Sequence, residues 1–220
     1  MNVLAFDCCT QACSAAVVAA DGRVLAHHAQ AMGRGQAEVL LPMIQAVLAE
    51  AGLSWAEIGL VGVTVGPGTF TGLRIGLAAA RGMAVAAGLP VAGVTTTETV
   101  AHAVPEAERR GRTLLVAIDG KRADVFVQAF AEDLTPMGEA AALMPGEVAR
   151  LFPGPLLLAG DGAGRLAEAC PGAFMSSAET TPNAVVLAGL AARHYCEGRS
   201  LSPAPLYLRP PDVTLPGVSA

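Results

Sequence analysis

The sequence predicts an α/β protein built from two mixed β-sheets, one in each half of the chain, with helices on their faces. The first observation is that short apolar runs rich in β-branched residues alternate with longer stretches of helical periodicity. The second is that each half opens with two such runs joined by a turn signal, Asp21-Gly22 in the first half and Asp119-Gly120 in the second. The third is the composition of the 220 residues, 53% hydrophobic and 15% charged, which excludes a disordered chain and suffices for a large core.

The first half is expected to contain three strands, followed by alternating helices and strands. Strands are predicted at residues 3–6, 14–20, 24–29, 60–65 and 91–94. A helix is predicted at residues 36–51, because apolar residues recur there at helical spacing and Gly52 is placed to end it. Ser54-Trp55-Ala56-Glu57 is a capping-box pattern for a short helix. A glycine-rich loop at 66–72 leads into a helix that ends near residue 87, and residues 95–104 have a helical pattern.

The second half repeats this hairpin-first pattern, which is typical of an internally duplicated fold. Strands are predicted at residues 114–118, 124–130 and 156–159, and a short helix at 145–152. Thr181 is the expected N-cap of a last helix that has Pro182 at its first position and ends near residue 197. We therefore expect two subdomains, residues 1–105 and 106–220, with the last helix able to pack back on the first subdomain.

Composition also predicts a cytoplasmic protein without a membrane segment. The longest runs without a charged residue, 58–73 and 82–97, are 16 residues each, shorter than the ~18 residues of a spanning helix. No basic segment precedes the first apolar stretch, which Asp7 interrupts, so no signal peptide is predicted. Five cysteines without metal-ligand spacing fit reduced thiols. The net charge of −5 argues against an extended nucleic-acid surface.

Two parts of the chain are candidates for binding a phosphate or a magnesium ion. Asp7 ends the first strand and Thr10 follows in a small polar turn, where an acid and turn N–H groups can hold such a ligand. Glycine-rich loops that open helices present free N–H groups to anions. The loop candidates are Gly66, Gly68, Thr69 and Gly72 in the first half, and Gly160 and Gly162 in the second. The alternative is that Asp7 caps a turn and that the glycines permit close packing.

Side-chain catalysis finds little support in the sequence. None of the four histidines has metal-ligand spacing, and no Gly-x-Ser-x-Gly elbow is present. No Lys-Ser/Thr pair follows the first glycine-rich loop, so it is not a Walker A loop. We expect no catalytic residue, no metal site, and at most weak binding of ATP or ADP with magnesium.

Several segments together resemble one protein family, TsaB. They are the opening Val-Leu-Ala-Phe-Asp-Cys-Cys-Thr at 3–10, Gln-Ala-Glu-Val-Leu-Leu-Pro at 36–42, Gly-Pro-Gly-Thr-Phe-Thr-Gly-Leu-Arg-Ile-Gly at 66–76, Leu-Pro-Val-Ala-Gly-Val at 89–94, and Pro-Leu-Tyr-Leu-Arg at 205–209. The segment at 66–76 is the most specific, and Gln36 stands where the family often has histidine. The resemblance spans nearly the whole chain and is strongest over residues 1–100.

The resemblance implies an actin-like (ASKHA, RNase H-like) fold of two subdomains and a role in tRNA modification. It implies a cytoplasmic, non-catalytic subunit that works with the paralogue TsaD and the ATPase TsaE, and contacts tRNA through that complex. These proteins transfer threonylcarbamoyl to the tRNA adenosine beside the anticodon. In TsaD, two histidines after a Gly-Val pair hold a metal; here the matching positions are Thr96 and Val100, which are unsuited to this role.

We expect the functional surface to be helical and to lie in the first subdomain. The expected interface residues are Val39, Met43, Ile44 and Val47 on the first helix, and Arg74, Ala79 and Met83 on the second. This surface would bind the TsaD-like paralogue, or a second copy of the chain when the paralogue is absent. The alternative is that both helices only cover their own sheet. The rival function, from another class, is a small actin-like ATP-binding kinase.

Overall fold

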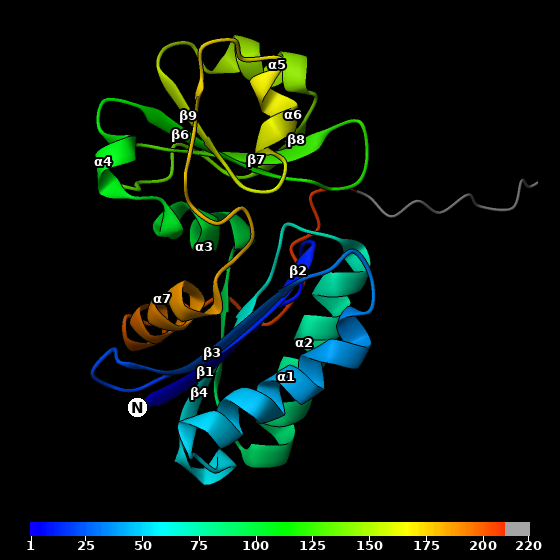
Figure 1. Ribbon diagram of the computed structural model, residues 1–220, viewed down its shortest axis with the longest axis vertical. Coiled ribbons are helices and arrows are strands. Elements are labelled where there is room, and N and C mark those ends of the chain that lie inside the picture. Colours follow the sequence, from blue (N-terminus) through cyan, green and yellow to red (C-terminus); the bar gives the residue numbers. More distant parts are fainter. Residues whose placement is uncertain (210–220) are drawn as a thin grey trace, which may run out of the picture.

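The computed structural model describes residues 1–209, which form two lobes, each built around a five-stranded mixed sheet (Figure 1). The first lobe holds β1–β5 and the second holds β6–β10. In chain order the elements are β1 (Asn2–Asp7), β2 (Ala12–Val18), β3 (Val24–Ala31), α1 (Gln36–Ala51), the 3₁₀ helix η1 (Trp55–Glu57), β4 (Ile58–Thr64), α2 (Phe70–Ala87), β5 (Val91–Val94), α3 (Thr96–Ala103), α4 (Glu106–Arg109), β6 (Thr113–Ile118), β7 (Val125–Phe130), β8 (Ala141–Leu143), α5 (Pro145–Leu151), β9 (Leu156–Ala159), α6 (Ala163–Ala167), β10 (Phe174–Met175) and α7 (Ala184–Cys196).

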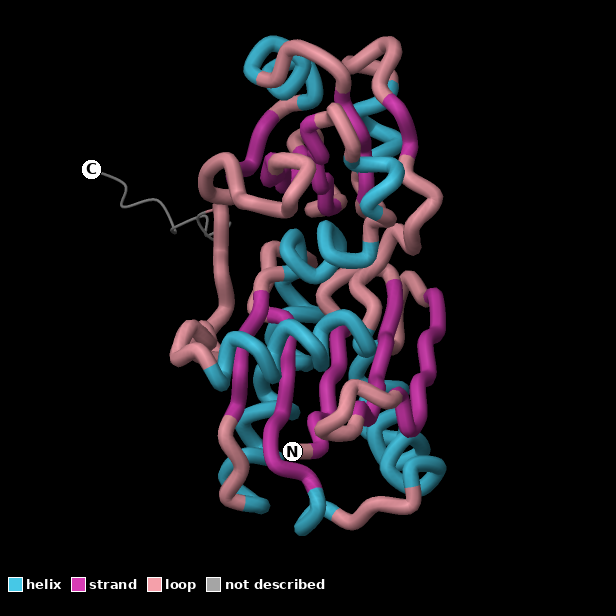
Figure 2. The backbone as a smooth tube through the Cα atoms, turned by 90° about the vertical axis from the view of Figure 1, so that its left-hand side faces the viewer, coloured by secondary structure: helices cyan, strands magenta, loops and turns pink. Residues whose placement is uncertain are grey.

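The two sheets have the same topology. The first has the order β3-β2-β1-β4-β5, and the second the matching order β8-β7-β6-β9-β10. In each sheet the first strand is central, pairs antiparallel with the second strand and pairs parallel with the fourth. Figure 2 shows the strands of the first sheet side by side in the lower lobe. This shared order confirms the predicted duplicated α/β fold.

The first sheet is covered on both faces. Successive residues of β1 point to opposite sides, so that Leu4 and Phe6 pack beneath α1 and α2, whereas Val3 and Ala5 face α7. Figure 1 shows α7 across the sheet from α1 and α2. α7 therefore completes the core of the first lobe.

The second sheet has α5 and α6 on one face and α3 on the other. Val148 of α5 and Leu166 of α6 belong to the first of these cores, and Val100 of α3 belongs to the second. α3 lies between the lobes in Figure 1 and also contacts α7, where Nε2 of His194 lies 3.0 Å from Oε1 of Glu98. α3, which connects the two lobes, thus packs against both the second sheet and α7.

Element positions differ from the prediction in a few places. α7 begins at Ala184, because the side chain of Asn183 accepts a hydrogen bond from the N–H of Val185 at 2.8 Å and caps the helix. The predicted start at Thr181 and Pro182 was therefore wrong. β2 begins two residues earlier than expected, at Ala12. The edge strands β8 and β10 were not predicted. Among residues 1–209, no helix is long and apolar enough to cross a membrane.

Candidate functional site

Asp7 lies at the end of β1 and is fully buried. Its Oδ1 accepts hydrogen bonds from the N–H of Cys9 at 3.1 Å and from the hydroxyl of Thr64 at 2.5 Å. Burial is the largest cause that raises the pKa of Asp7 to about 6, and repulsion from the charge of Asp161 adds to it. Asp7 is thus a buried carboxyl group with a raised pKa, at the end of β1 that faces the second lobe.

Several buried oxygen atoms near Asp7 have no hydrogen-bond partner within residues 1–209. They are Oδ2 of Asp7, Oγ1 of Thr10, Oγ1 of Thr96 and Oδ2 of Asp161. Thr96 opens α3 and joins this junction through its N–H, which donates to the carbonyl of Gly66 at 2.8 Å. Sequence reasoning found Asp7 and Thr10 but missed Thr96 and Asp161 as their neighbours, because the fold brings these segments together.

The first glycine-rich loop is closed by the chain itself. A Cβ at Gly68 would lie 2.5 Å from the carbonyl oxygen of Cys9, and one at Gly72 would lie 2.0 Å from that of Cys8. Thr69 caps α2: its hydroxyl accepts from the N–H of Gly72, and its own N–H donates to the carbonyl of Cys9 at 2.7 Å. Gly66, at φ +109°, takes a backbone conformation that favours glycine. These glycines serve close packing of α2 on the turn after β1.

The second glycine-rich loop is built in the same way. A Cβ at Gly160 would lie 2.2 Å from the carbonyl oxygen of Ala117, which also accepts a hydrogen bond from the N–H of Gly162 at 3.0 Å. Oδ1 of Asp161 accepts from the N–H of Asp119 at 2.8 Å. Burial raises the pKa of Asp161 to about 6. The loop therefore holds the ends of β6 and β9 together.

These residues do not fit the phosphates of a bound nucleotide. Phosphate binding needs free N–H donors or cations, yet the N–H groups of Thr69, Gly72 and Leu73 at the start of α2 donate within the chain. The buried carboxylates of Asp7 and Asp161 would repel a phosphate. Lys121, the single lysine of the sequence, pairs with Asp119 at 3.0 Å. Weak nucleotide binding stays a prediction, and we assign no chemical step to it.

The two positions that the resemblance matches to metal-holding histidines lie in the core of this chain. The side chains of Thr96 and Val100 are buried on α3, and Val100 packs against the second sheet. Within residues 1–209, no group of three or more His, Cys, Asp or Glu side chains is placed to hold a metal ion. α3 acts here as a packing element between the lobes.

Part of the predicted helical interface is wrong. Met43, Ile44 and Val47 are buried against the first sheet, because α1 turns its widest apolar face toward its own core. Of the remaining interface residues, Val39 and Ala79 are half-buried against the same core and Arg74 is exposed. Met83, the last of them, is half-buried and belongs to a surface hollow.

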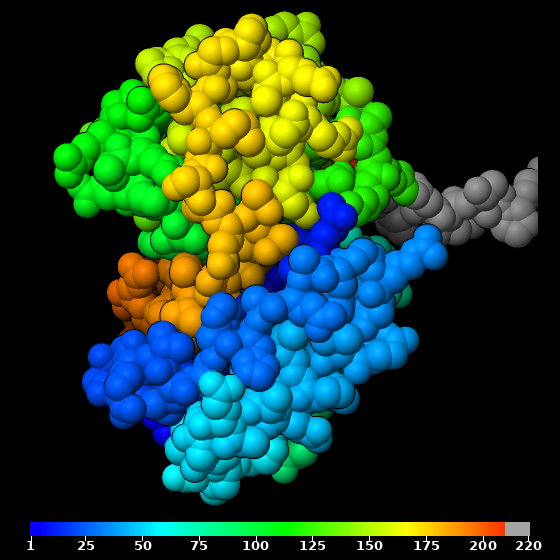
Figure 3. All heavy atoms as spheres, viewed as in Figure 1, coloured from blue at the N-terminus to red at the C-terminus, as the bar shows by residue number. Residues whose placement is uncertain are grey.

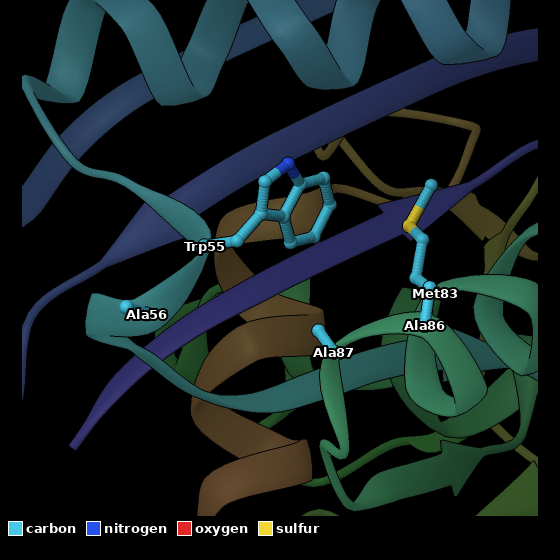
Figure 4. A pocket seen from close by; sticks show the side chains of 5 residues that line it. All are labelled: Trp55, Ala56, Met83, Ala86 and Ala87. Carbon is cyan, nitrogen blue, oxygen red and sulfur yellow. The ribbon is translucent and has the colours of Figure 1, made fainter.

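The hollow lies where η1 approaches the end of α2, and its volume is about 550 Å³. Its lining residues are Trp55, Ala56, Met83, Ala86 and Ala87. Figure 4 shows the indole of Trp55 and the thioether of Met83 facing each other across the hollow, with the two small alanines of α2 below them. Val85 of the same turn is 87% exposed. This end of α2 is apolar and open.

Residues 201–209, which we call the C-terminal strap, run from the first lobe to the second. Leu201 and Gly93 of the edge strand β5 exchange backbone hydrogen bonds of 3.0 and 3.1 Å. Further along, the N–H of Leu206 donates to the carbonyl of Val65 at 2.7 Å. The strap therefore covers an open edge of the first sheet.

Two side chains of the strap make long-range contacts. The hydroxyl of Tyr207 accepts a hydrogen bond from Nε of Arg74 at 3.0 Å. Arg209 reaches the second lobe, where its Nε donates to Oδ2 of Asp124 at 2.5 Å and its guanidinium lies 4.2 Å from the ring centre of Phe126. The space-filling view shows the two lobes in direct contact (Figure 3). The Pro-Leu-Tyr-Leu-Arg motif is visible in the sequence, but the residues that Tyr207 and Arg209 contact lie far away in the sequence and could not be predicted from it.

Comparisons with known proteins place these features in a family. Residues 26–197 match the family model described as "TsaD: tRNA N6-adenosine threonylcarbamoyltransferase". The Escherichia coli K12 "tRNA threonylcarbamoyladenosine biosynthesis protein TsaB" is 38% identical over 134 residues, 60% of this chain and 56% of that protein. The match thus spans little more than half of the E. coli protein. An uncharacterised protein of Mycobacterium tuberculosis H37Rv is 34% identical over 96% of this chain and 93% of its own.

Solved structures agree with this placement. YeaZ from Pseudomonas aeruginosa superposes with a TM-score of 0.81 at 29% identity, over 94% of this chain and 99% of that chain. The activator of the 2-hydroxyisocaproyl-CoA dehydratase from Clostridium difficile superposes with a TM-score of 0.52 at 11% identity, over 90% of this chain and 97% of that one, which shows a shared actin-like fold alone. The chain belongs to the TsaD family of tRNA N6-adenosine threonylcarbamoyltransferase proteins, among its TsaB-like members.

Proposed function

We propose that this chain is a non-catalytic subunit in the synthesis of threonylcarbamoyladenosine in tRNA. It works with a TsaD-type paralogue, which carries out the transfer, and with a TsaE-type ATPase. The observation that carries the proposal is the full-length likeness to YeaZ combined with the buried Thr96 and Val100 at the two metal positions. A chain with this fold and without those ligands suits a supporting role better than catalysis.

The partner surface we propose is the open end of α2 with η1. An apolar hollow between Trp55 and Met83, bordered by small alanines, accepts an apolar side chain of a partner helix. A paralogue presents a similar pair of helices, so a pseudo-symmetric dimer fits. The same surface would join two copies of this chain when the paralogue is absent.

The test is reconstitution with the paralogue and the ATPase. We expect the three proteins together to modify tRNA, and expect no modification by this chain alone or by the other two without it. Ala86→Glu places a charge in the hollow, and we expect it to weaken co-purification with the paralogue at least tenfold, since burying an unpaired charge costs several kcal/mol. Ala107→Glu, at another exposed alanine, on α4, is the matched control. Full activity of the Ala86→Glu variant would place the interface elsewhere, and full activity without this chain would refute the proposed function.

The rival function is a small actin-like kinase, which the shared fold suggests. Packing of both glycine-rich loops against their own lobes disfavours it. Isothermal calorimetry with ATP and magnesium distinguishes the two proposed functions. A kinase of this kind should bind ATP with a micromolar or lower Kd, which is a binding free energy of about −8 kcal/mol or better. We expect binding weaker than this for the isolated chain.

A further inference from the structure

Three of the five cysteines lie at one end of the β1–β2 hairpin. They are Cys8, Cys9 and Cys13. The antiparallel register sets Asp7 opposite Ser14, and carried one residue further it sets Cys8 opposite Cys13. Opposed residues of antiparallel strands have Cα atoms about 4.5–5.5 Å apart, within the ~4.4–6.8 Å that a disulfide requires. The continued register is therefore compatible with disulfide spacing between Cys8 and Cys13.

The side chains distinguish one pair among the three. Cys8 and Cys13 point into the same core beneath α1 and α2, and the neighbouring Cys8 side chain lowers the pKa of Cys13. Cys9 points away from them, with its Sγ 2.8 Å from the hydroxyl of Thr64. All three thiols are free and buried, whereas Cys196 is exposed.

We propose that Cys8 and Cys13 form a redox-active dithiol that hydrogen peroxide converts to an intramolecular disulfide. The Cys13 thiolate attacks one peroxide oxygen, the O–O bond breaks, and a sulfenic acid and hydroxide form. The Cys8 sulfur then attacks the sulfenic sulfur; the S–S bond forms, the S–O bond breaks, and the Cys8 proton leaves with that oxygen as water. The hydroxide takes the proton that Cys13 gave up. Two thiols and one peroxide thus give one disulfide and two waters.

Oxidation has a structural consequence at the start of α2. The Cys8 thiol donates a hydrogen bond to the carbonyl of Gly72 at 3.3 Å, and Gly72 lies in the first turn of α2. A disulfide sulfur has no hydrogen to donate, so this bond is lost when Cys8 and Cys13 are joined. The redox state of the hairpin is therefore transmitted to the helix that packs on it.

The experiment treats the full-length protein with hydrogen peroxide, blocks remaining thiols with N-ethylmaleimide and weighs the tryptic peptide of residues 1–23. We expect this peptide to lose two hydrogens and to carry one maleimide, on Cys9. The buried pair should react more slowly than Cys196, which serves as an internal clock. Hydrogen exchange of the first turn of α2 should become roughly fivefold faster in the oxidised protein, the change that loss of one hydrogen bond produces.

Variants identify the pair. Cys9→Ala should form the same disulfide, whereas Cys8→Ala should not, and its Cys13 sulfenic acid should then be trapped by dimedone. Circular dichroism verifies that each variant is folded, and Cys196→Ala removes the exposed thiol as a matched control. The proposal would be overturned if all three cysteines of the 1–23 peptide still carried maleimide long after Cys196 had been oxidised. So would a disulfide in Cys8→Ala that forms as fast as in the unchanged protein.

Discussion

Asp7 makes the stability of this protein depend on pH in the direction opposite to that of a salt-bridged carboxylate. Its pKa rises from 3.8 to about 6 on folding, because burial disfavours the charged form. The folded state therefore holds the proton more tightly than the unfolded state. Stability that this group contributes is present at about pH 4 and is lost as the pH rises through about 6.

Asp7→Asn should therefore stabilise the protein at pH 7.5. The amide keeps an oxygen to accept from Cys9 and Thr64 but carries no charge. A shift of about two pKa units sets the upper limit near 3 kcal/mol, and we expect a gain of about 1–3 kcal/mol in the free energy of unfolding from urea titrations. The gain should shrink toward zero at pH 4. Asp21→Asn, at an exposed turn, is the control, and an equal gain at both pH values would contradict this account.

Single residues also show where sequence reasoning stops. Asp7 and Thr10 stand out because an acid and a hydroxyl follow an apolar strand. Nothing in the spacing connects them with Asp161, more than 150 positions later, since only the docking of the two lobes brings these oxygens together. The sequence thus predicts the polar end of one strand but not the junction it belongs to.

At the scale of elements, the start of α2 depends on the absence of a side chain at one position. Gly72→Ala would place a Cβ 2.0 Å from the backbone oxygen of Cys8, which cannot move without disturbing β1. We expect a loss of more than about 2 kcal/mol in the free energy of unfolding. Gly82→Ala lies in the same helix with nothing within 4 Å of its Cβ, and should gain about 0.5–1 kcal/mol. Equal effects of the two substitutions in denaturant titrations would refute the packing role of Gly72.

Most elements could be predicted because their apolar periodicity matches the face they bury. α1, α2, β5 and β9 lie within two residues of their predicted bounds. The short edge strands β8 and β10 could not be predicted, since two or three residues carry no period and their pairing depends on a neighbour far along the chain. For α1, periodicity alone could not show whether the apolar face packs on its own sheet or on a partner protein. Ile44 is buried in the structure, so this face belongs to the core.

At the scale of the whole molecule, the C-terminal strap ties the lobes together through Arg209. The side chains of Arg209 and Asp124 are 17% and 22% exposed, so their ion pair is shielded from water. Arg209→Ala should lower the free energy of unfolding by about 1–3 kcal/mol and speed hydrogen exchange in the turn at residues 119–124. Arg199→Ala, which removes an ion pair with Glu197 that is about half exposed, is the control. Unchanged exchange at 119–124 would show that the strap does not hold the lobes.

Because α7 packs on the first sheet, the core of the first lobe cannot be completed until nearly the whole chain has been synthesised. Val3, Ala5 and Val94 are made early, but the helix that covers them begins only at Ala184. A ribosome adding about 5–20 residues per second needs roughly 5–20 s to make residues 95–183. During that time the nascent chain exposes one apolar face of its first sheet. Chaperone capture on the ribosome should therefore be strongest before α7 emerges, and translation that stops short of it should leave an aggregation-prone fragment.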